Sequence, residues 1–196
     1  MRITIDGPDG LGKTTISKKL AEELGFAYIH FPYYENETGQ KIIDMLNHKI
    51  PWDALTFQCL QTCNRIQTIK LLEDLEKEHG GIIIDRNNPS TIVYGKLDGL
   101  SEELLETLIS VLPKSNMEII ILADKPYRLN GDFYEDIEKW KQTKELYLEY
   151  YARRKASQCV WLAQNEGSIE ECIAECKRLI KKQEEIIYRI DRYKRN

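Results

Sequence analysis

The residues best suited to chemistry stand near the start of the chain, in a glycine-rich stretch that closes on a lysine and two threonines. This stretch matches the pattern G-x-x-x-x-G-K-[ST], and its residues are Gly7, Pro8, Asp9, Gly10, Leu11, Gly12, Lys13, Thr14 and Thr15. Glycines let the backbone turn tightly, so that successive N–H groups point inward at anionic oxygens. Lys13 would reach the β- and γ-phosphates, and the Thr14 hydroxyl would complete a magnesium shell. The stretch therefore predicts a binding site for a nucleoside triphosphate.

The segments on both sides of this loop are suited to hold it in place. Before it, residues 3–5 are a short run that favours a β-strand. After it, Ile16, Leu20 and Leu24 recur at helical spacing. A helix that begins at the loop adds the positive end of its dipole and its unpaired N–H groups to the phosphate site. A glycine-rich turn that matched the pattern by chance would lack this context.

The rest of the chain alternates between strand-like and helix-like segments. Strands are expected at residues 3–5, 27–31, 82–84, 117–122 and 159–162. Helices are expected at residues 13–24, 38–47, 52–78 and 132–155, after a cap at Ser101 and after a cap at Ser168. The longest helix has an apolar stripe made of Leu55, Cys59, Cys63, Ile66, Ile69 and Leu72. This alternation predicts an α/β fold of the P-loop NTPase type, with three layers: a central parallel sheet of about five strands and helices on both faces.

Size and composition fit one soluble domain. With 196 residues, of which 42% are hydrophobic and 31% charged, the chain is long enough for one α/β domain and short for two. We therefore expect a single domain over residues 1–196. The formal net charge of -4 gives no indication of a basic surface for binding nucleic acid, so small molecules are the expected partners. No segment has the length of a membrane span and no signal-peptide pattern precedes the first strand, so a cytoplasmic location is expected.

Cysteines and tyrosines cluster at helical spacing, and we expect both clusters to be structural. The cysteine pairs, each at i, i+4, are Cys59 with Cys63 and Cys172 with Cys176. No histidine stands at a matching spacing, so reduced thiols on helices explain these pairs better than a metal site does. The tyrosines expected to pack in the core, at i, i+3 and i+4, are Tyr147, Tyr150 and Tyr151.

An acid and an arginine follow the apolar run at residues 82–84. An acid at the end of a buried strand is where a P-loop protein places its second magnesium contact, usually through water, and Asp85 holds that position. The carboxyl edge of a parallel sheet is also where ligands bind. Arg86 can fork onto a phosphate with two N–H bonds. The structural alternative is an ion pair at the strand end, between Asp85 and Arg86 or a neighbour.

Several motifs together resemble those of thymidylate kinases, the P-loop enzymes that phosphorylate dTMP to dTDP. Residues 7–15 are similar to their G-x-[DE]-G-x-G-K-T-T loop, and residues 85–94 to their D-R-x-x-x-S-x-x-[AV]-[YF] motif. The segments 31–32, 64–67, 132–135 and 147–148 resemble the shorter family motifs F-P, N-R-x-x-Q, D-R-x-E and Y-L. The resemblance runs in order through nearly the whole chain. It implies a transferase of nucleotide biosynthesis that uses ATP and Mg2+ and takes a deoxynucleoside monophosphate as its acceptor.

The resemblance also implies roles for the matching residues. On the ATP side, the implied contacts are Gly7, Asp9, Gly10, Leu11, Gly12, Lys13, Thr14, Thr15, Ala163, Gln164 and Asn165. Thr14 and Asp85 would hold the magnesium ion. Lys13, Asp85 and Arg86 would take part in catalysis.

On the acceptor side, the implied contacts are Asp9, Phe31, Gln61, Arg65, Arg86, Ser90 and Tyr94. Among these, Asp9 would hold the 3′-hydroxyl, Arg86 would grip the 5′-phosphate and Arg65 would hydrogen-bond to the pyrimidine carbonyl. Phe31 would form an apolar wall. For Ser90 or Tyr94 alone, a capping or packing role is the open alternative.

Two positions depart from the residues that are usual in the family. Gln61 stands where the family often has a phenylalanine that stacks on thymine, and His30 stands where it often has an arginine for the acceptor phosphate. Both departures fall on the acceptor side, so the reaction type is retained while the choice of base stays open. Gln61 could hydrogen-bond to a base edge in place of stacking, or it could face solvent.

A further cation is expected near the migrating phosphoryl group, where charge builds up in the transition state. The loop itself has no arginine, because glycine and leucine occupy the positions that carry one in some family members. We therefore expect a short lid at about residues 125–135, with Arg128 as its catalytic arginine. Lys125 or Arg153 could supply the charge instead, and a solvated surface arginine is the structural alternative for Arg128.

Two classes of function stay open from the sequence. One is a nucleoside monophosphate kinase, for dTMP or for another deoxynucleoside monophosphate. The other is a nucleotide-binding switch protein without acceptor chemistry. Asp9 and Asp85, with Arg65 and Arg86 between them, favour the enzyme, because a switch needs no second phosphate site. Thymidylate kinases commonly pair through their long helices, so residues 52–78 could form a homodimer interface.

Overall fold

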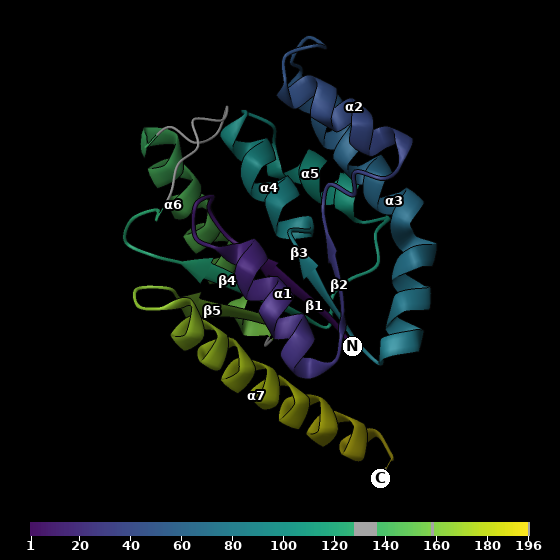
Figure 1. The fold of residues 1–196 in the computed structure, drawn as a ribbon, viewed down its shortest axis with the longest axis vertical. Helices are drawn as coiled ribbons and strands as arrows, with labels where there is room; N and C mark the ends of the chain where they lie inside the picture. Colours follow the sequence, from purple (N-terminus) through teal and green to yellow (C-terminus); the bar gives the residue numbers. More distant parts are fainter. Residues whose placement is uncertain (128–136, 158, 196) are drawn as a thin grey trace.

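The core of the structure is a five-stranded sheet in which every strand pair runs parallel (Figure 1). The computed structural model describes residues 1–127, 137–157 and 159–195. The strand order is β2-β3-β1-β4-β5, with the bounds Ala27–His30, Ile82–Asp85, Arg2–Asp6, Met117–Leu122 and Val160–Gln164. The isoleucines of the three central strands are fully or almost fully buried, as expected where both faces of a strand are covered. The predicted parallel sheet is therefore confirmed.

Helices cover both faces of this sheet. Their bounds are α1 Lys13–Leu24, α2 Glu37–Leu46, α3 Ala54–His79, α4 Asn88–Leu97, α5 Glu102–Ile109, α6 Ile137–Arg154 and α7 Ile169–Arg195. α1 and α7 share one apolar cluster with the sheet, while α4, α5 and α6 share another and α3 a third. α2 packs on the first half of α3, away from the strands (Figure 1). The three predicted layers are present.

Local signals in the sequence set the helix ends. Gly25 ends α1 with a φ of 68°, a left-handed conformation that a residue without Cβ adopts at little cost. The side chains of Ser101 and Ser168 accept hydrogen bonds from the backbone N–H groups of Leu104 and Glu171, so both predicted caps are confirmed. α4 is missed by periodicity, because eight consecutive residues of this helix, 88–95, are buried and leave no polar face in that stretch.

The buried face of the long helix α3 is not the face that carries its apolar stripe. Of the six stripe residues, Leu72 alone is buried, whereas Leu55, Cys63 and Ile66 are exposed. The buried face is largely polar and includes Gln58, Gln61, Thr62, Asn64, Arg65 and Thr68. The apolar periodicity of this helix therefore points away from the core, and its polar face borders a cavity described below.

The structure describes only the first residues, 125–127, of the lid predicted at about residues 125–135. Residues 128–136 lie outside the described residues, and they include Arg128 and the first residues of the predicted helix 132–155. The described part of that helix is α6, which begins at Ile137. Lys125 is described and is exposed.

The cysteines lie where helical spacing predicts them. All are free thiols; Cys59 and Cys63 lie on α3, and Cys172 and Cys176 are buried on α7. In the described parts of the chain, no group of three or more His, Cys, Asp or Glu side chains gathers as a metal site would require. Among the same residues, no helix is both long enough and apolar enough to cross a membrane.

Candidate active site

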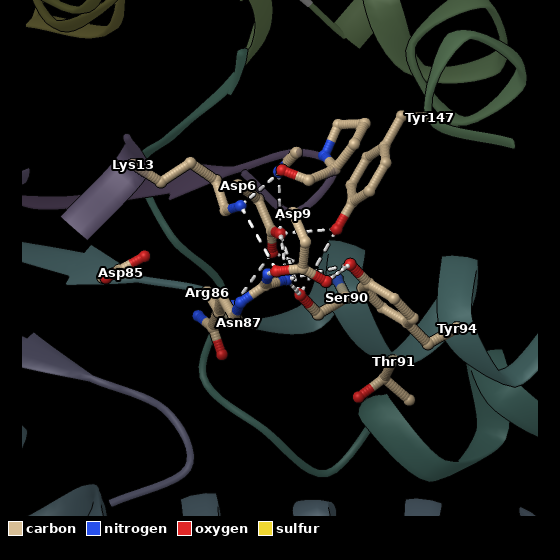
Figure 2. A network of polar contacts seen from close by, with 12 residues as sticks. Asp6, Asp9, Lys13, Asp85, Arg86, Asn87, Ser90, Thr91, Tyr94 and Tyr147 are labelled. Atoms are coloured by element: carbon tan, nitrogen blue, oxygen red, sulfur yellow. Dashed lines mark hydrogen bonds and ion pairs between the residues drawn. The ribbon is translucent and has the colours of Figure 1, made fainter. Parts of the chain in front are cut away.

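The carboxyl ends of β1 and β3 bring the predicted catalytic residues together. These strands are neighbours in the sheet, with Ile5 opposite Asp85. β1 therefore delivers the P-loop, residues 7–13, to the same edge at which β3 delivers Asp85 and Arg86. In Figure 2, acidic side chains from β1 and the P-loop converge on Arg86. The crevice outside the carboxyl ends of parallel strands is where such folds bind ligands.

The P-loop depends on glycine at its start. Gly7 has a φ of 142°, and a Cβ there would lie 2.2 Å from the carbonyl oxygen of Ile121, so any other residue would force the backbone to move. Leu11 is fully buried and anchors the loop in the core. α1 begins directly after Gly12. The unpaired N–H groups of its first turn are thus available to phosphate oxygens.

Lys13 folds back over the loop from the first turn of α1. It is 5% exposed, its Nζ donates to the carbonyl oxygen of Pro8 at 2.5 Å, and Nζ lies 3.8 Å from Oδ1 of Asp9. Burial, together with the positive charge of Arg86, lowers the pKa of Lys13 to about 8. A phosphate chain in the loop would give this buried amine a close anionic partner.

Thr14 and Asp85 form a second polar pair beside the loop. The Thr14 hydroxyl donates to Oδ2 of Asp85 at 2.6 Å, and the Tyr28 hydroxyl donates to the same oxygen at 3.4 Å. Asp85 is 4% exposed, and its Oδ1 has no hydrogen-bond partner among the described residues. A buried carboxylate oxygen without a partner, close to a hydroxyl oxygen, suits a hard divalent cation such as Mg2+. The two residues fit the metal-binding role expected from the sequence.

Arg86 is the centre of the acceptor side. Its φ of 65° lies in the left-handed region, which is strained for a residue with a side chain. Residues held in such strained conformations cluster at functional sites. Its guanidinium pairs with Asp9 and donates to the Ser90 hydroxyl at 3.2 Å and to the Tyr94 hydroxyl at 3.4 Å (Figure 2). The side chain turns toward Asp9 and not toward Asp85. An ion pair between Asp85 and Arg86 is therefore the wrong interpretation of the strand end.

Asp9 links the P-loop to the acceptor side. Its carboxylate accepts hydrogen bonds from Arg86 and, at 2.6 Å, from the Tyr94 hydroxyl. Burial raises the pKa of Asp9, but the charges of Arg86 and Lys13 and the hydrogen bond from Tyr94 outweigh burial and hold this pKa below its ordinary value. Asp9 is therefore ionised at neutral pH and can accept a hydrogen bond from a substrate hydroxyl.

Asp6, the last residue of β1, is a candidate that the sequence analysis misses. It is fully buried, and its Oδ1 accepts hydrogen bonds from Gly7 N, Ser90 Oγ and the Tyr147 hydroxyl at 2.9, 2.8 and 2.6 Å. Its Oδ2 accepts from the backbone N–H groups of Asn87 and Ser90 at 3.0 and 3.1 Å. One carboxylate thus joins the P-loop, the start of α4 and α6 (Figure 2). The available signal was an acid directly before the first glycine of the P-loop.

A cavity of about 350 Å³ opens on the acceptor side. Every residue expected on that side lines it: Asp9, Phe31, Gln61, Arg65, Arg86, Ser90 and Tyr94. Gln61 is 8% exposed, so the alternative that it faces solvent is wrong. His30 packs edge-on against Tyr34, with ring centroids 4.9 Å apart. Apolar walls with a few convergent polar groups are typical of a small-molecule site.

Arg65 reaches this cavity from α3 and is 3% exposed. Its Nη1 donates to the Thr91 hydroxyl at 2.6 Å and its Nη2 to the carbonyl oxygen of Asn87 at 3.0 Å. Its Nε has no partner among the described residues. Burial lowers the pKa of Arg65 to about 10, so the side chain is still a cation at neutral pH. A fixed group that can only donate suits a carbonyl oxygen of a base.

The segment expected to meet the ATP base lies at the end of β5. Ala163 is fully buried in the core and Asn165 is 1% exposed, whereas Gln164 is exposed. The Asn165 side chain donates from Nδ2 to the carbonyl oxygen of Leu11 at 2.9 Å. Asn165 therefore fastens the P-loop, a role that the sequence analysis did not predict.

Arg153, the reserve candidate for transition-state charge, lies far from the P-loop. Trp140, in the first turn of α6, donates from Nε1 to the carbonyl oxygen of Asp9 at 2.8 Å. Arg153 stands near the other end of the same helix, about 20 Å away along its axis at a rise of about 1.5 Å per residue. Its ion-pair partners are Glu102 and Glu149. The alternative that Arg153 acts on the phosphoryl group is therefore wrong.

Comparisons with known proteins agree with this geometry. The family model described as thymidylate kinase matches residues 5–175. The chain is 29% identical over 154 residues to a probable thymidylate kinase of Methanocaldococcus jannaschii, with 76% of this chain and 80% of that protein covered. It is 30% identical over 188 residues to a probable thymidylate kinase of Sulfolobus acidocaldarius, with 88% of this chain and 92% of that protein covered.

Solved structures share the fold. The thymidylate kinase of Candida albicans superimposes with a TM-score of 0.82 at 22% identity, over 93% of this chain and 92% of that one. The thymidylate kinase of Ehrlichia chaffeensis does so with a TM-score of 0.76 at 19% identity, over 92% of this chain and 98% of that one. Similarity to solved structures at these low sequence identities establishes the fold alone. The family follows from the family model, which matches most of the chain. This protein belongs to the thymidylate kinase family.

Proposed function

We propose that this protein transfers the γ-phosphoryl group of ATP to the 5′-phosphate of dTMP, with ADP and dTDP as products. The observation that carries the proposal is the meeting of two phosphate sites at Asp9. The P-loop lysine, Lys13, lies near one oxygen of Asp9, and Arg86, which lines the acceptor cavity, pairs with the same carboxylate. A switch protein needs only the first of these sites, so the arrangement favours a kinase.

The site would promote phosphoryl transfer through position and charge. An oxygen of the acceptor phosphate attacks the γ-phosphorus in line, and the bond from that phosphorus to the β–γ bridging oxygen breaks as the new bond forms. Lys13 and the N–H groups of the P-loop hold the β- and γ-phosphates and stabilise the charge that develops. Arg86 holds the acceptor phosphate with its fork of donors and so offsets the repulsion between the two anions.

The acids beside the loop would have separate roles. Magnesium, when bound, supplies positive charge to the β- and γ-phosphate oxygens. Thr14 and Asp85 would hold it, since Oδ1 of Asp85 is buried and has no partner among the described residues. Asp9 contacts Arg86 and Tyr94 instead. It would orient the acceptor by accepting a hydrogen bond from the 3′-hydroxyl.

The exposed stripe of α3 supports a second proposal, that two copies of the chain pair through this helix. Leu55 is 41% exposed and Ile66 is 44% exposed, and the exposed Cys63 lies between them on the same stripe. Apolar side chains at successive turns of one helix form a strip that a second copy of the same strip would bury.

A coupled assay of ADP release over a panel of nucleoside monophosphates tests the kinase proposal. dTMP should give the highest kcat/KM. Lys13→Ala should lower turnover by about two to three orders of magnitude, because it removes an electrostatic contact with the transferring group. Faster turnover of another deoxynucleoside monophosphate would identify a kinase with a different acceptor. ATP binding without turnover of any acceptor would indicate a switch protein.

A further inference from the structure

Two glutamine side chains of α3 line the acceptor cavity with carboxamides that pair with no described residue. Gln58 and Gln61 stand one turn apart on α3, are 1% and 8% exposed, and line the cavity. Neither carboxamide makes a hydrogen bond with any residue that the structure describes. Polar side chains of largely buried residues are paired in the large majority of cases, so two neighbouring carboxamides that are left open to a cavity need an explanation.

The neighbouring polar residues on the same face of α3 are paired. Thr62 donates to the carbonyl oxygen of Gln58 at 2.9 Å, and Thr68 to that of Asn64 at 2.6 Å. The Asn64 carboxamide accepts from the backbone N–H of Tyr33 at 2.7 Å and donates to its carbonyl oxygen at 2.8 Å. Gln58, Gln61 and Arg65 are the exceptions on this face, and all three residues line the cavity. The two carboxamides pair with no described residue, and the Nε of Arg65 is buried without a partner. This distribution indicates a polar ligand in the cavity rather than loose packing of the helix.

Gln58, Gln61 and Arg65 form a polar strip along the cavity wall. From Gln58 to Arg65 the helix advances about 10 Å, and residues three and four apart share one face. The cavity also has apolar walls, to which Phe31 and Phe57 contribute, and its lining includes Arg86. Such a cavity suits a planar ring whose polar edge meets the strip while a phosphate meets Arg86.

We propose that Gln58 and Gln61 select the acceptor by hydrogen-bonding to the edge of its base. This inference rests on the proposed function and adds to it the groups that choose the base. A carboxamide both donates and accepts, whereas Arg65 can only donate. Together they complement an imide edge, in which an N–H stands between two carbonyl oxygens, as in thymine and uracil. Cytosine would bring an amino group toward a guanidinium that cannot accept, so this pocket rejects it.

The expected discrimination is strong because a bound base would cover these polar groups. A site built for hydrogen bonds rejects an analogue that lacks them far more strongly than an apolar pocket rejects a small change of size. An acceptor whose base has no polar edge would remove the carboxamides from water without forming hydrogen bonds to them. The cost of desolvating the carboxamides would then not be offset. The shape of the base alone should therefore not make a good acceptor.

The test compares dTMP with the 5′-monophosphate of a difluorotoluene deoxynucleoside, which has the shape of thymidine and a nonpolar ring edge. The wild-type protein should use dTMP at least about 100-fold better in kcat/KM. Gln61→Leu should lower kcat/KM for dTMP by about 10- to 100-fold, mainly through KM, and should raise it for the nonpolar analogue. The ratio of kcat/KM for dTMP to kcat/KM for the nonpolar analogue should thus change more than either value of kcat/KM alone. Gln58→Leu should shift the ratio in the same direction.

Gln142→Leu is the matched control, because Gln142 is exposed on α6 and does not line the cavity. It should leave the values for both substrates unchanged. Gln61→Leu should melt at or above the wild-type temperature, since it places an apolar side chain at a largely buried position whose carboxamide has no protein partner. A lower melting temperature with an unchanged substrate ratio would assign Gln61 a structural role and overturn the inference.

Failure of this inference and failure of the kinase proposal give different results. If the wild-type protein phosphorylates dTMP and the nonpolar analogue equally well, selection by the carboxamides is overturned and the kinase function stands. Equal use of dCMP and dTMP would overturn the selection of an imide edge in the same way. If no nucleoside monophosphate is phosphorylated, the kinase proposal fails and the inference fails with it.

Discussion

The hydroxyl group of Tyr147 donates a hydrogen bond of 2.6 Å to Oδ1 of Asp6 and thereby joins α6 to the residue that precedes the P-loop. Both side chains are fully buried. The same oxygen accepts from the Ser90 hydroxyl, which in turn accepts from Arg86 at 3.2 Å. The placement of the P-loop relative to the acceptor-side arginine therefore depends on this carboxylate, and Tyr147 helps to hold it.

Removal of the Tyr147 hydroxyl should impair turnover more than ATP binding. Tyr147→Phe keeps the ring that packs in the core and loses one buried hydrogen bond, which should cost about 1 kcal/mol of stability. Because Asp6 would be held less firmly, kcat should fall by about three- to tenfold, with KM for ATP within about twofold of wild type. Steady-state kinetics with both substrates varied measures these changes.

Tyr150→Phe is the matched control for that variant. Tyr150 lies on the same helix, but its hydroxyl donates at 2.6 Å to Glu118 on β4. This control should lose similar stability and keep its kcat. Equal losses of kcat in the two variants would contradict a positioning role for Tyr147.

The two acids beside the P-loop should affect different kinetic parameters. Asp9→Asn weakens the contact with Arg86 and the proposed contact with the 3′-hydroxyl of the acceptor, so it should chiefly raise KM for the monophosphate. Asp85→Asn removes a charged oxygen from the proposed magnesium site, so it should chiefly lower kcat and the affinity for magnesium. Kinetics at varied concentrations of magnesium and monophosphate separate the two effects. Equal losses in the same parameter would mean that the roles are assigned wrongly.

The parts of this fold that the sequence predicts well are those with a local cause. The core of β3 is an unbroken apolar run, β4 is apolar apart from Glu118, and the P-loop is a pattern of residues whose conformation depends mainly on its own glycines. Gly25 and Ser101 set helix ends through contacts with their neighbours along the chain. Because these signals act over a few residues, the fold class and the P-loop could both be predicted.

Features that depend on distant contacts could not be predicted in this way. α3 turns a polar face inward because the acceptor cavity lies there, and apolar periodicity carries no information about a cavity. Asp6 pairs with Ser90 and Tyr147, which come near it only when the sheet and α6 are assembled. The same holds for Asn165, whose hydrogen bond to Leu11 joins the end of β5 to the P-loop.

A charge in the apolar strip of α3 should separate paired copies of the chain. Ile66 is 44% exposed, so Ile66→Glu should leave the fold intact while it places a charge where the partner strip would pack. Sedimentation equilibrium should show a dimer for the wild type and a monomer for this variant. Lys77→Glu, at an exposed position near the end of the same helix, should stay dimeric. A monomeric wild type would contradict the proposed interface.

Glu118 on β4 is a partly buried acid whose charge should make stability depend on pH. Burial, together with the charge of Asp6, raises the pKa of Glu118 from 4.5 to about 7, although the hydrogen bond from Tyr150 opposes the shift. The folded protein therefore keeps this proton at pH values where the unfolded chain has released it. Stability should fall as pH rises from about 4.5 to 7, and the full loss should be present above that window.

Glu118→Gln should remove this dependence on pH. The amide keeps an oxygen that accepts from Tyr150 and has no proton to lose, so the variant should gain stability relative to wild type as pH rises from about 4.5 to 7. At the upper end the gain should be about 2–3 kcal/mol, or about 5–10 °C in melting temperature for a chain of this size. Thermal denaturation across this pH range measures the gain, with the exposed Glu166→Gln as the control. If the melting temperatures of Glu118→Gln and wild type differ by the same amount at every pH, Glu118 titrates in the folded protein as it does in the unfolded chain.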